Sequence, residues 1–187
     1  MISRLGYIKR VSVEKYKKQD RGGKGSNSAA LLEDDYINQL FIGSTKDYLL
    51  FITNVGKAYW IKVHEIPESE RTSRGAHIKS LLAVGPDEEI TAVVSLKEFA
   101  EDQYLFMTTA NGVVKKVHTT EFSNAKTRGI IGLKLDTGDK LISAIQTTGS
   151  TEVMLISRRG KALKIKEDSV RSMGRASRGI KGMKLAE

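Results

Sequence analysis

The chain has 187 residues, of which 40% are hydrophobic, and a net charge of +9 at pH 7. This hydrophobic content is not that of a disordered chain, and the excess of Lys and Arg favours a polyanionic partner such as nucleic acid or an anionic membrane surface. Cysteine is absent, which excludes disulfides, thiolate nucleophiles and cysteine metal ligands. No segment approaches the roughly 20 apolar residues of a membrane-spanning helix. The sequence therefore predicts a soluble, cytoplasmic protein.

A glycine followed by a basic or aromatic strand recurs four times along the chain, at 6–11, 56–61, 112–117 and 160–165. Ten residues after each glycine comes an apolar residue, and apolar runs at 48–52, 104–107 and 153–156 precede the last three glycines. The four apolar residues are Tyr16, Ile66, Phe122 and Val170. Three landmarks in register predict an array of repeats of about fifty residues each.

The apolar runs are short and rich in β-branched and aromatic residues, which predicts buried strands. Turn-type residues lie between each run and the next glycine, so we expect hairpins there, with a type I′ turn at Asn111-Gly112. One helical turn is expected at 97–101.

These elements predict an all-β fold arranged as a propeller-like array or β-pinwheel. About three and a half blades are expected, at 5–54, 55–110 and 111–158, with a partial blade at 159–187. The sequence ends inside its fourth repeat, so we expect either a piece of a longer array or a shortened relative of one, with unpaired strand edges in the last repeat.

The richest combination of glycines and cations lies at 19–25, and weaker Arg-Gly copies follow at 74–75, 128–129 and 178–179. The front of each repeat, from the glycine strand through this loop, carries a net charge of +6, +2, +4 and +7 in turn, whereas the three intervening segments are acidic. Because equivalent positions of a radial array lie on one rim, we expect a cationic band that follows a phosphate backbone without reading base sequence. A solvated charged surface is the alternative.

We assign phosphate contact to the cations of these fronts and to the box at 19–25. The first repeat contributes Lys9, Arg10, Lys17, Lys18, Gln19, Asp20, Arg21, Gly22, Gly23, Lys24 and Gly25. The second contributes Lys62, Arg71, Arg74 and Lys79, and the third contributes Lys115, Lys116, Lys126, Arg128 and Lys134. The last contributes Lys161, Lys164, Arg171, Arg175, Arg178 and Lys181.

Other chemistries find little support in the residue pattern. His64, His77 and His118 lack paired metal-ligand spacing, and the acidic run 33–35 has no partner cluster. The glycines at 22–25 lack the spacing of a nucleotide-binding P-loop, and no nucleophile elbow occurs. We therefore predict no catalytic residue, metal site or cofactor in this chain. Trp60 is expected to pack at a blade rim, with DNA contact as the alternative.

With these residues assembled, the chain resembles the C-terminal domain of the DNA gyrase A protein over essentially its whole length. The residues that carry the resemblance are the box at 19–25, which matches the family signature Gln-Arg-Arg-Gly-Gly-Lys-Gly at six of seven positions, and the stretches 2–10, 65–68 and 71–75. The departure is Asp20, which stands where the family has an arginine. An aspartate there either weakens one phosphate contact or pairs with Arg21 or Lys24.

The resemblance implies a six-bladed β-pinwheel, of the bacterial type IIA topoisomerases, whose basic rim bends and wraps double-stranded DNA and so supports ATP-dependent negative supercoiling. It implies as partners the rest of the gyrase A protein and the gyrase B protein, and no membrane. The active-site tyrosine and the ATPase, with its ATP and Mg²⁺, belong to other domains. Two alternatives are the equivalent domain of topoisomerase IV and a propeller that binds acidic proteins.

Overall fold

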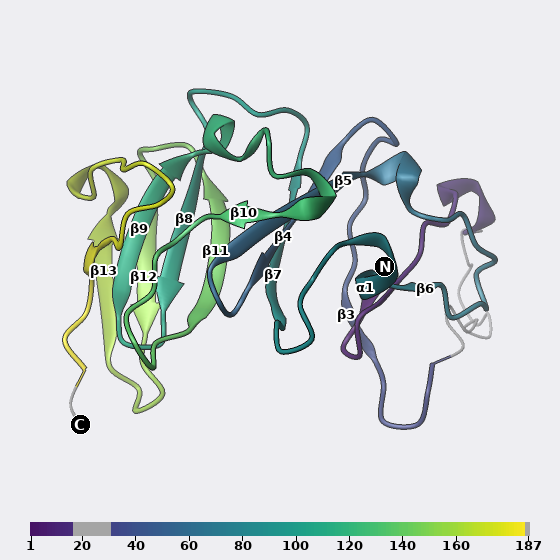
Figure 1. The fold of residues 1–187 in the computed structure, drawn as a ribbon, viewed down its shortest axis with the longest axis horizontal. Helices are drawn as coiled ribbons and strands as arrows, with labels where there is room; N and C mark the ends of the chain where they lie inside the picture. The colour runs from purple at the N-terminus through teal and green to yellow at the C-terminus, as the bar shows by residue number, and fades with distance from the viewer. Residues whose placement is uncertain (17–30, 186–187) are drawn as a thin grey trace, which may run out of the picture.

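The computed structural model describes residues 1–16 and 31–185. Its secondary structure is almost entirely antiparallel β-sheet, and four sheets follow one another along the long axis of the molecule (Figure 1). The all-β prediction is confirmed. No helix in the described part of the chain is long and apolar enough to cross a membrane.

Each of the first three sheets has four strands. The first sheet contains β1 (Ile2–Ser3), β2 (Tyr7–Ile8), β3 (Ile37–Gln39) and β6 (Ala76–His77), in the order β3-β1-β2-β6. The second contains β4 (Tyr48–Thr53), β5 (Lys57–Lys62), β7 (Ile90–Leu96) and β10 (Ile130–Ile131), in the order β10-β5-β4-β7. The third contains β8 (Tyr104–Thr109), β9 (Val113–His118), β11 (Leu141–Thr147) and β14 (Ile180–Lys181), in the order β11-β8-β9-β14. The fourth consists of the hairpin β12 (Glu152–Ile156) and β13 (Ala162–Lys166).

Neighbouring sheets exchange strands. β6 follows the hairpin of the second sheet along the chain but pairs with β2 of the first, and β10 and β14 are likewise delivered to β5 and β9 of the preceding sheets. The repeat boundaries drawn at 54/55, 110/111 and 158/159 fall inside hairpins, so each of them divides one sheet. The repeat of the sequence and the sheet in space are therefore different units.

The four repeat glycines close four equivalent hairpins. Gly6, Gly56, Gly112 and Gly160 have φ values of 84°, 78°, 80° and 78°, a region that glycine enters without steric cost. Each glycine N–H donates to the carbonyl three residues earlier, where a Ser or Thr hydroxyl also accepts the N–H that follows the glycine. Asn111 does not have a positive φ, so the type I′ turn expected at 111–112, which needs two such residues, is wrong.

Short 3₁₀ turns follow the second strand of each hairpin: η1 (Val13–Lys15), η2 (Val63–Glu65), η3 (Thr119–Phe122) and η5 (Glu167–Ser169). Ile66, Phe122 and Val170, three of the four residues ten positions after the glycine, are buried there, whereas Tyr16 is exposed. One further 3₁₀ turn, η4 (Lys126–Arg128), and a single helical turn, α1 (Ile78–Leu81), complete the described elements. The helical turn expected at 97–101 is wrong, because residues 97–98 form a bend, 99–100 have no regular structure and 101 begins a turn.

The core lies between successive sheets. Leu50 and Ile52 of β4 pack in a cluster with Leu105 and Met107 of β8, whereas the alternating β4 residues Leu49 and Phe51 pack with the first sheet. Phe106 of β8 packs toward the fourth sheet in a third cluster. Because both faces of these strands are covered, their sequences are continuous apolar runs rather than alternating ones.

Candidate nucleic-acid interface

Three loops, each containing an Arg-Gly pair, deliver the exchanged strands. We call residues 71–75, 126–129 and 175–179 the Arg-Gly loops of the first, second and third sheets, after the sheet that each one joins through β6, β10 and β14. Their glycines, Gly75, Gly129 and Gly179, have φ values of 91°, 75° and 90°.

The glycines of these loops are required by close contact with the neighbouring sheet. A Cβ atom on Gly75 would lie 2.4 Å from the Ile8 carbonyl oxygen, and one on Gly179 would lie 2.6 Å from the Val114 oxygen. A Cβ on Gly129 would lie 2.2 Å from the ring of Tyr59. The glycine therefore lets the loop reach the neighbouring sheet, while the arginine before it, at 74, 128 or 178, is exposed in all three loops.

Most of the predicted cations outside the hairpin strands are at least partly exposed. The side chains of seven of them form no ion pair, cation–ring contact or hydrogen bond with another described residue: Arg71, Lys126, Arg128, Lys134, Lys161, Arg171 and Lys181. Surface cations without an acidic partner raise the local positive potential and are available to phosphate oxygens.

Other predicted cations already have partners within the protein. Arg10 pairs with Glu68 at 3.1 Å, Lys164 with Glu152 at 3.0 Å and Arg178 with Asp136 at 2.9 Å. The Arg178 and Lys164 pairs are exposed on both sides, and such pairs contribute at most about 1 kcal/mol, so a phosphate can compete for the cation.

Contacts with rings and carbonyls hold four further cations. Arg74 lies over the Tyr7 ring at 5.5 Å, and Lys62 over the Tyr48 ring at 5.2 Å. Lys79 donates to the carbonyls of Gly85 and Pro86, and Arg175 donates to the Ile131 carbonyl at 3.1 Å.

Lys9, Lys115 and Lys116 are buried, with exposed fractions of 3%, 0% and 6%. Lys115 Nζ donates to the carbonyls of Gly132 (2.9 Å), Ser177 (3.0 Å) and Arg175, and Lys9 Nζ donates to those of Ser73 (2.9 Å) and Arg71. Lys116 Nζ donates to the Glu167 carbonyl at 3.1 Å. Their assignment as surface cations is corrected, because these ammonium groups face backbone oxygens instead of solvent.

Burial changes the acidity of two of these lysines. It lowers the pKa of Lys9 below its usual value. It also lowers the pKa of Lys115 to about 8, with a smaller contribution from the Arg175 charge and an opposing one from Glu121. Because desolvation disfavours the charged form, the hydrogen bonds to backbone carbonyls take the place of the water that each ammonium group loses on burial.

The second sheet has Tyr59 where its neighbours have Lys9 and Lys115. The buried Tyr59 hydroxyl donates to Glu88 Oε2 at 2.9 Å, and Lys57 pairs with the other oxygen of the same carboxylate. Burial opposes ionisation of Glu88, but the hydrogen bonds from Lys57 and Tyr59 outweigh it and hold the pKa of Glu88 below its usual value. This group was not found in the sequence, where Glu88 was one of several acidic residues between repeats.

Trp60 packs against other rings, as expected. Its ring lies 4.9 Å from that of Tyr48 and 5.8 Å from that of Phe99, and Nε1 donates to the carbonyls of Phe122 and Ser123 at 3.1 Å. Those acceptors occupy its single donor, so Trp60 is a packing residue in this structure. The box at 19–25 and Lys17 and Lys18 lie outside the described residues.

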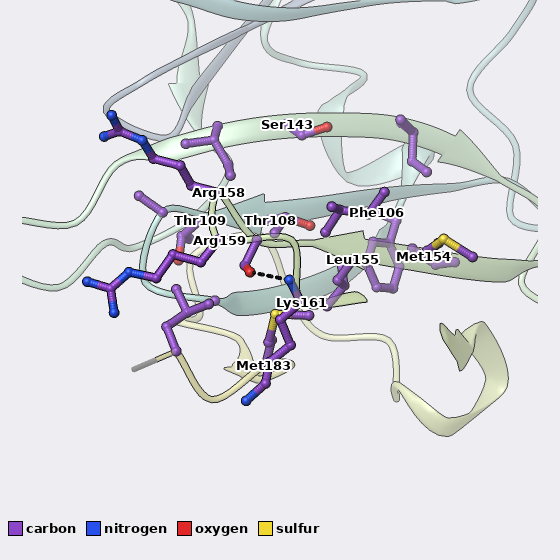
Figure 2. A pocket seen from close by; sticks show the side chains of 18 residues that line it. Phe106, Thr108, Thr109, Ser143, Met154, Leu155, Arg158, Arg159, Lys161 and Met183 are labelled. Atoms are coloured by element: carbon purple, nitrogen blue, oxygen red, sulfur yellow. Dashed lines mark hydrogen bonds between the residues drawn. The ribbon is translucent and has the colours of Figure 1, made fainter. Parts of the chain in front are cut away.

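A hollow of about 1070 Å³ lies between the third and fourth sheets (Figure 2). Phe106, Leu155 and Met183 line it, with Arg158 and Lys161 among the polar side chains. None of the described residues that line it is acidic or a histidine. Among residues 1–16 and 31–185, no group of three or more His, Cys, Asp or Glu side chains is placed to hold a metal ion.

The stacked four-stranded sheets, with cationic loops carrying strands from one sheet to the next, define a propeller-like repeat domain with a basic surface. A family described as "DNA gyrase C-terminal domain, beta-propeller" matches residues 1–44, 47–97, 103–148 and 151–187. The chain belongs to this family. The first three matched ranges each contain three strands of one sheet, and the fourth strand of that sheet comes from the next range.

Known proteins agree with this membership. The chain is 60% identical over 177 residues to the DNA gyrase A protein of Treponema pallidum (strain Nichols), covering 95% of this chain and 22% of that protein. It is 42% identical over 186 residues to the DNA gyrase A protein of Escherichia coli (strain K12), covering 100% of this chain and 21% of that one. The chain thus spans about a fifth of the length of these curated relatives.

Two solved structures share the fold over the whole chain. A DNA gyrase A C-terminal domain aligns with a TM-score of 0.77 and 34% identity, covering 60% of that structure. The C-terminal domain of DNA topoisomerase IV aligns with a TM-score of 0.84 and 29% identity, covering 56% of that structure.

Proposed function

We propose that this domain binds double-stranded DNA without sequence preference, bends it along the Arg-Gly loops and wraps it, in support of ATP-dependent negative supercoiling. The observation that carries the proposal is the repetition of one exposed arginine in the Arg-Gly loops of all three sheets, at 74, 128 and 178. A backbone-following contact needs cations at regular intervals, and successive stacked sheets supply that spacing.

The proposed role is structural within a larger enzyme. We expect the remainder of the gyrase A protein to supply the active-site tyrosine and the gyrase B protein to supply ATP hydrolysis, so that this domain needs neither ATP nor Mg²⁺ of its own. Cytoplasmic DNA is the expected substrate of the assembly. The family membership and the 60% identical gyrase relative support this assignment.

Binding to linear duplex DNA over a range of salt concentrations tests the proposal. If about six to ten phosphates are engaged, the logarithm of the affinity falls against the logarithm of salt with a slope of about −5 to −9. Replacing Lys126 and Arg128 by Ala should make this slope less steep by about two, because each cation that contacts a phosphate contributes about one unit.

A matched control removes two exposed lysines outside the proposed band, Lys97 and Lys140. This double Ala variant loses the same charge, and its salt slope should equal that of the wild type. No binding by the wild type at low salt would refute the proposal. Equal losses in both double variants would show that net charge alone matters, and that the loops do not form a track.

The equivalent domain of topoisomerase IV is the second candidate, and the structural similarity to that protein favours it. Sequence identity favours gyrase, at 34% against 29% for the two solved structures.

A further inference from the structure

A lysine occupies the same position of the hairpin in the first and third sheets. Lys9 and Lys115 each stand three residues after a hairpin glycine, on the segment that receives the exchanged strand from the next repeat. Both side chains are buried, and both point their ammonium groups at the Arg-Gly loop of their own sheet.

The two lysines bond equivalent atoms of their loops. Lys9 donates to the carbonyls of Arg71 and Ser73 in the sequence Arg-Thr-Ser-Arg-Gly, and Lys115 donates to those of Arg175 and Ser177 in Arg-Ala-Ser-Arg-Gly. Counted back from the loop glycine, the acceptors are the same two residues. Because the same contact occurs in two separate sheets, it is a repeated feature of the fold and not one accidental contact.

Lys115 also connects its loop to the segment before it. Its third acceptor is the Gly132 carbonyl, and the backbone N–H of Lys134 donates to the Ser177 carbonyl at 3.1 Å. One ammonium group thus uses three N–H donors on three carbonyls from two loop segments. The loop also has bonds of its own, since the N–H and the hydroxyl of Ser177 both donate to the Gly174 carbonyl.

The surroundings of the Lys115 side chain do not favour its charged ammonium form. Burial lowers the pKa of Lys115, and the charged side chains acting on it are Glu121, which favours the ammonium, and Arg175, which opposes it. A buried charge retained against a desolvation penalty contributes little to stability, but its directional hydrogen bonds can select one geometry. The arginines of the same loop, at 175 and 178, need one fixed path of the loop backbone in order to face phosphates.

We propose that Lys115, and Lys9 at the equivalent position, are positioning residues that hold the Arg-Gly loops by their carbonyls so that the arginines of those loops face DNA phosphates. This inference rests on the proposed DNA-binding function. It reverses the direct role that the sequence suggested, since the two lysines act through the loop and do not touch the nucleic acid.

The first experiment measures DNA binding by K115M, whose side chain is similar in length but has no donor. If the whole loop is displaced, the salt slope becomes less steep by about two, the number of arginines at 175 and 178, whereas loss of one direct contact changes it by about one. In an R175A/R178A background, K115M should cause no further loss of affinity. The charge-matched control K140M should leave the slope unchanged.

The second experiment needs no DNA and remains informative if the proposed function fails. Limited trypsin digestion of K115M, followed by mass spectrometry, should show cleavage after Arg175 and Arg178 accelerated about tenfold or more, as expected when a local hydrogen-bonded unit opens. Cleavage after Arg128, in the loop of the second sheet, is the reference within the same sample.

Each outcome decides the proposal. Selective acceleration at 175 and 178 supports the claim that Lys115 holds the loop, and this part stands even if the wild type does not bind DNA. Equal acceleration at all three sites would mean that K115M only destabilises the domain, and no acceleration would mean that the loop does not need the lysine, so both results overturn it. If K115M does not fold, K9M carries the same test, with cleavage after Arg71 and Arg74 as the readout.

Discussion

The Arg-Gly loops of the first and third sheets are attached differently from the loop of the second sheet. In the first and third, an ammonium group bonds loop carbonyls, and the loop contains the sequence Arg-x-Ser-Arg-Gly. In the second, the Tyr59 ring packs beneath Gly129, and the loop forms a 3₁₀ turn in which Lys126 has a φ of 43°. Its Thr127 carbonyl accepts from Ala83 N–H at 2.9 Å instead of from a lysine.

Comparison of the three Arg-Gly loops shows which features all of them share and which features differ between them. All three loops keep the left-handed glycine and the exposed arginine before it. The buried group beneath the loop is either a lysine bonded to carbonyls or a tyrosine bonded to the Glu88 carboxylate. Presentation of an arginine at the surface is therefore the shared property, and the two kinds of support are alternative ways to obtain it.

The largest expected effect comes from filling the space above Tyr59. G129A places a methyl group 2.2 Å from the ring at a φ of 75°, so we expect a loss of at least about 3 kcal/mol in the free energy of unfolding. The matched control is G160A, which has a φ of 78° but no atom within 4 Å of the new methyl group. It should lose about 1 kcal/mol from backbone strain alone.

Urea unfolding of both variants measures these losses. If G160A were as destabilised as G129A, the left-handed backbone rather than the contact with Tyr59 would account for the glycine. The loop of the second sheet would then not depend on its aromatic support.

A smaller effect is expected for the third sheet, where Lys115 should make the free energy of unfolding depend on pH. The pKa of Lys115 is about 8 in the folded protein and about 10.4 in an unfolded chain. Between these values the unfolded state binds more protons at this group, so its contribution makes the free energy of unfolding rise with pH, by up to about 1.4 kcal/mol per pH unit.

Urea unfolding of the wild type and K115M from pH 7.5 to 10 isolates this contribution, because all other titrating groups are common to both proteins. The stability of the wild type relative to K115M should increase over this range. A constant difference would mean that Lys115 has an ordinary pKa and is not buried as the structure shows it.

Much of the fold could be predicted because it is repeated in the sequence. The glycine register placed the hairpins, and the apolar runs at 48–52, 104–107 and 153–156 placed the strands that are covered on both faces. The exchanged strands could not be found, since β6, β10 and β14 have two residues each and show no periodicity. The turn at 111–112 was misassigned because Asn-Gly indicates a type I′ turn only where both residues take a positive φ.

The candidate site was predicted in part. The arginines before the loop glycines are exposed as the band requires, but the pairs Lys9-Arg10 and Lys115-Lys116 were treated as surface charge when three of the four side chains are buried. A signal was present in the sequence: lysine three residues after the hairpin glycine occurs only with Arg-x-Ser-Arg-Gly in the next repeat, and Tyr59 with a different loop. Charge counts alone cannot separate a surface cation from a buried one that bonds carbonyls.

Relaxation of closed circular DNA in the presence of this protein tests the central claim, that the loops guide DNA along a curved path. A nicking-closing topoisomerase removes all unconstrained supercoils, and gel electrophoresis after removal of the protein reports the linking number. We expect a shift in linking number that grows with protein concentration and is reduced in the R175A/R178A variant. Saturated binding with an unchanged linking number would contradict the account, because the domain would then hold DNA without wrapping it.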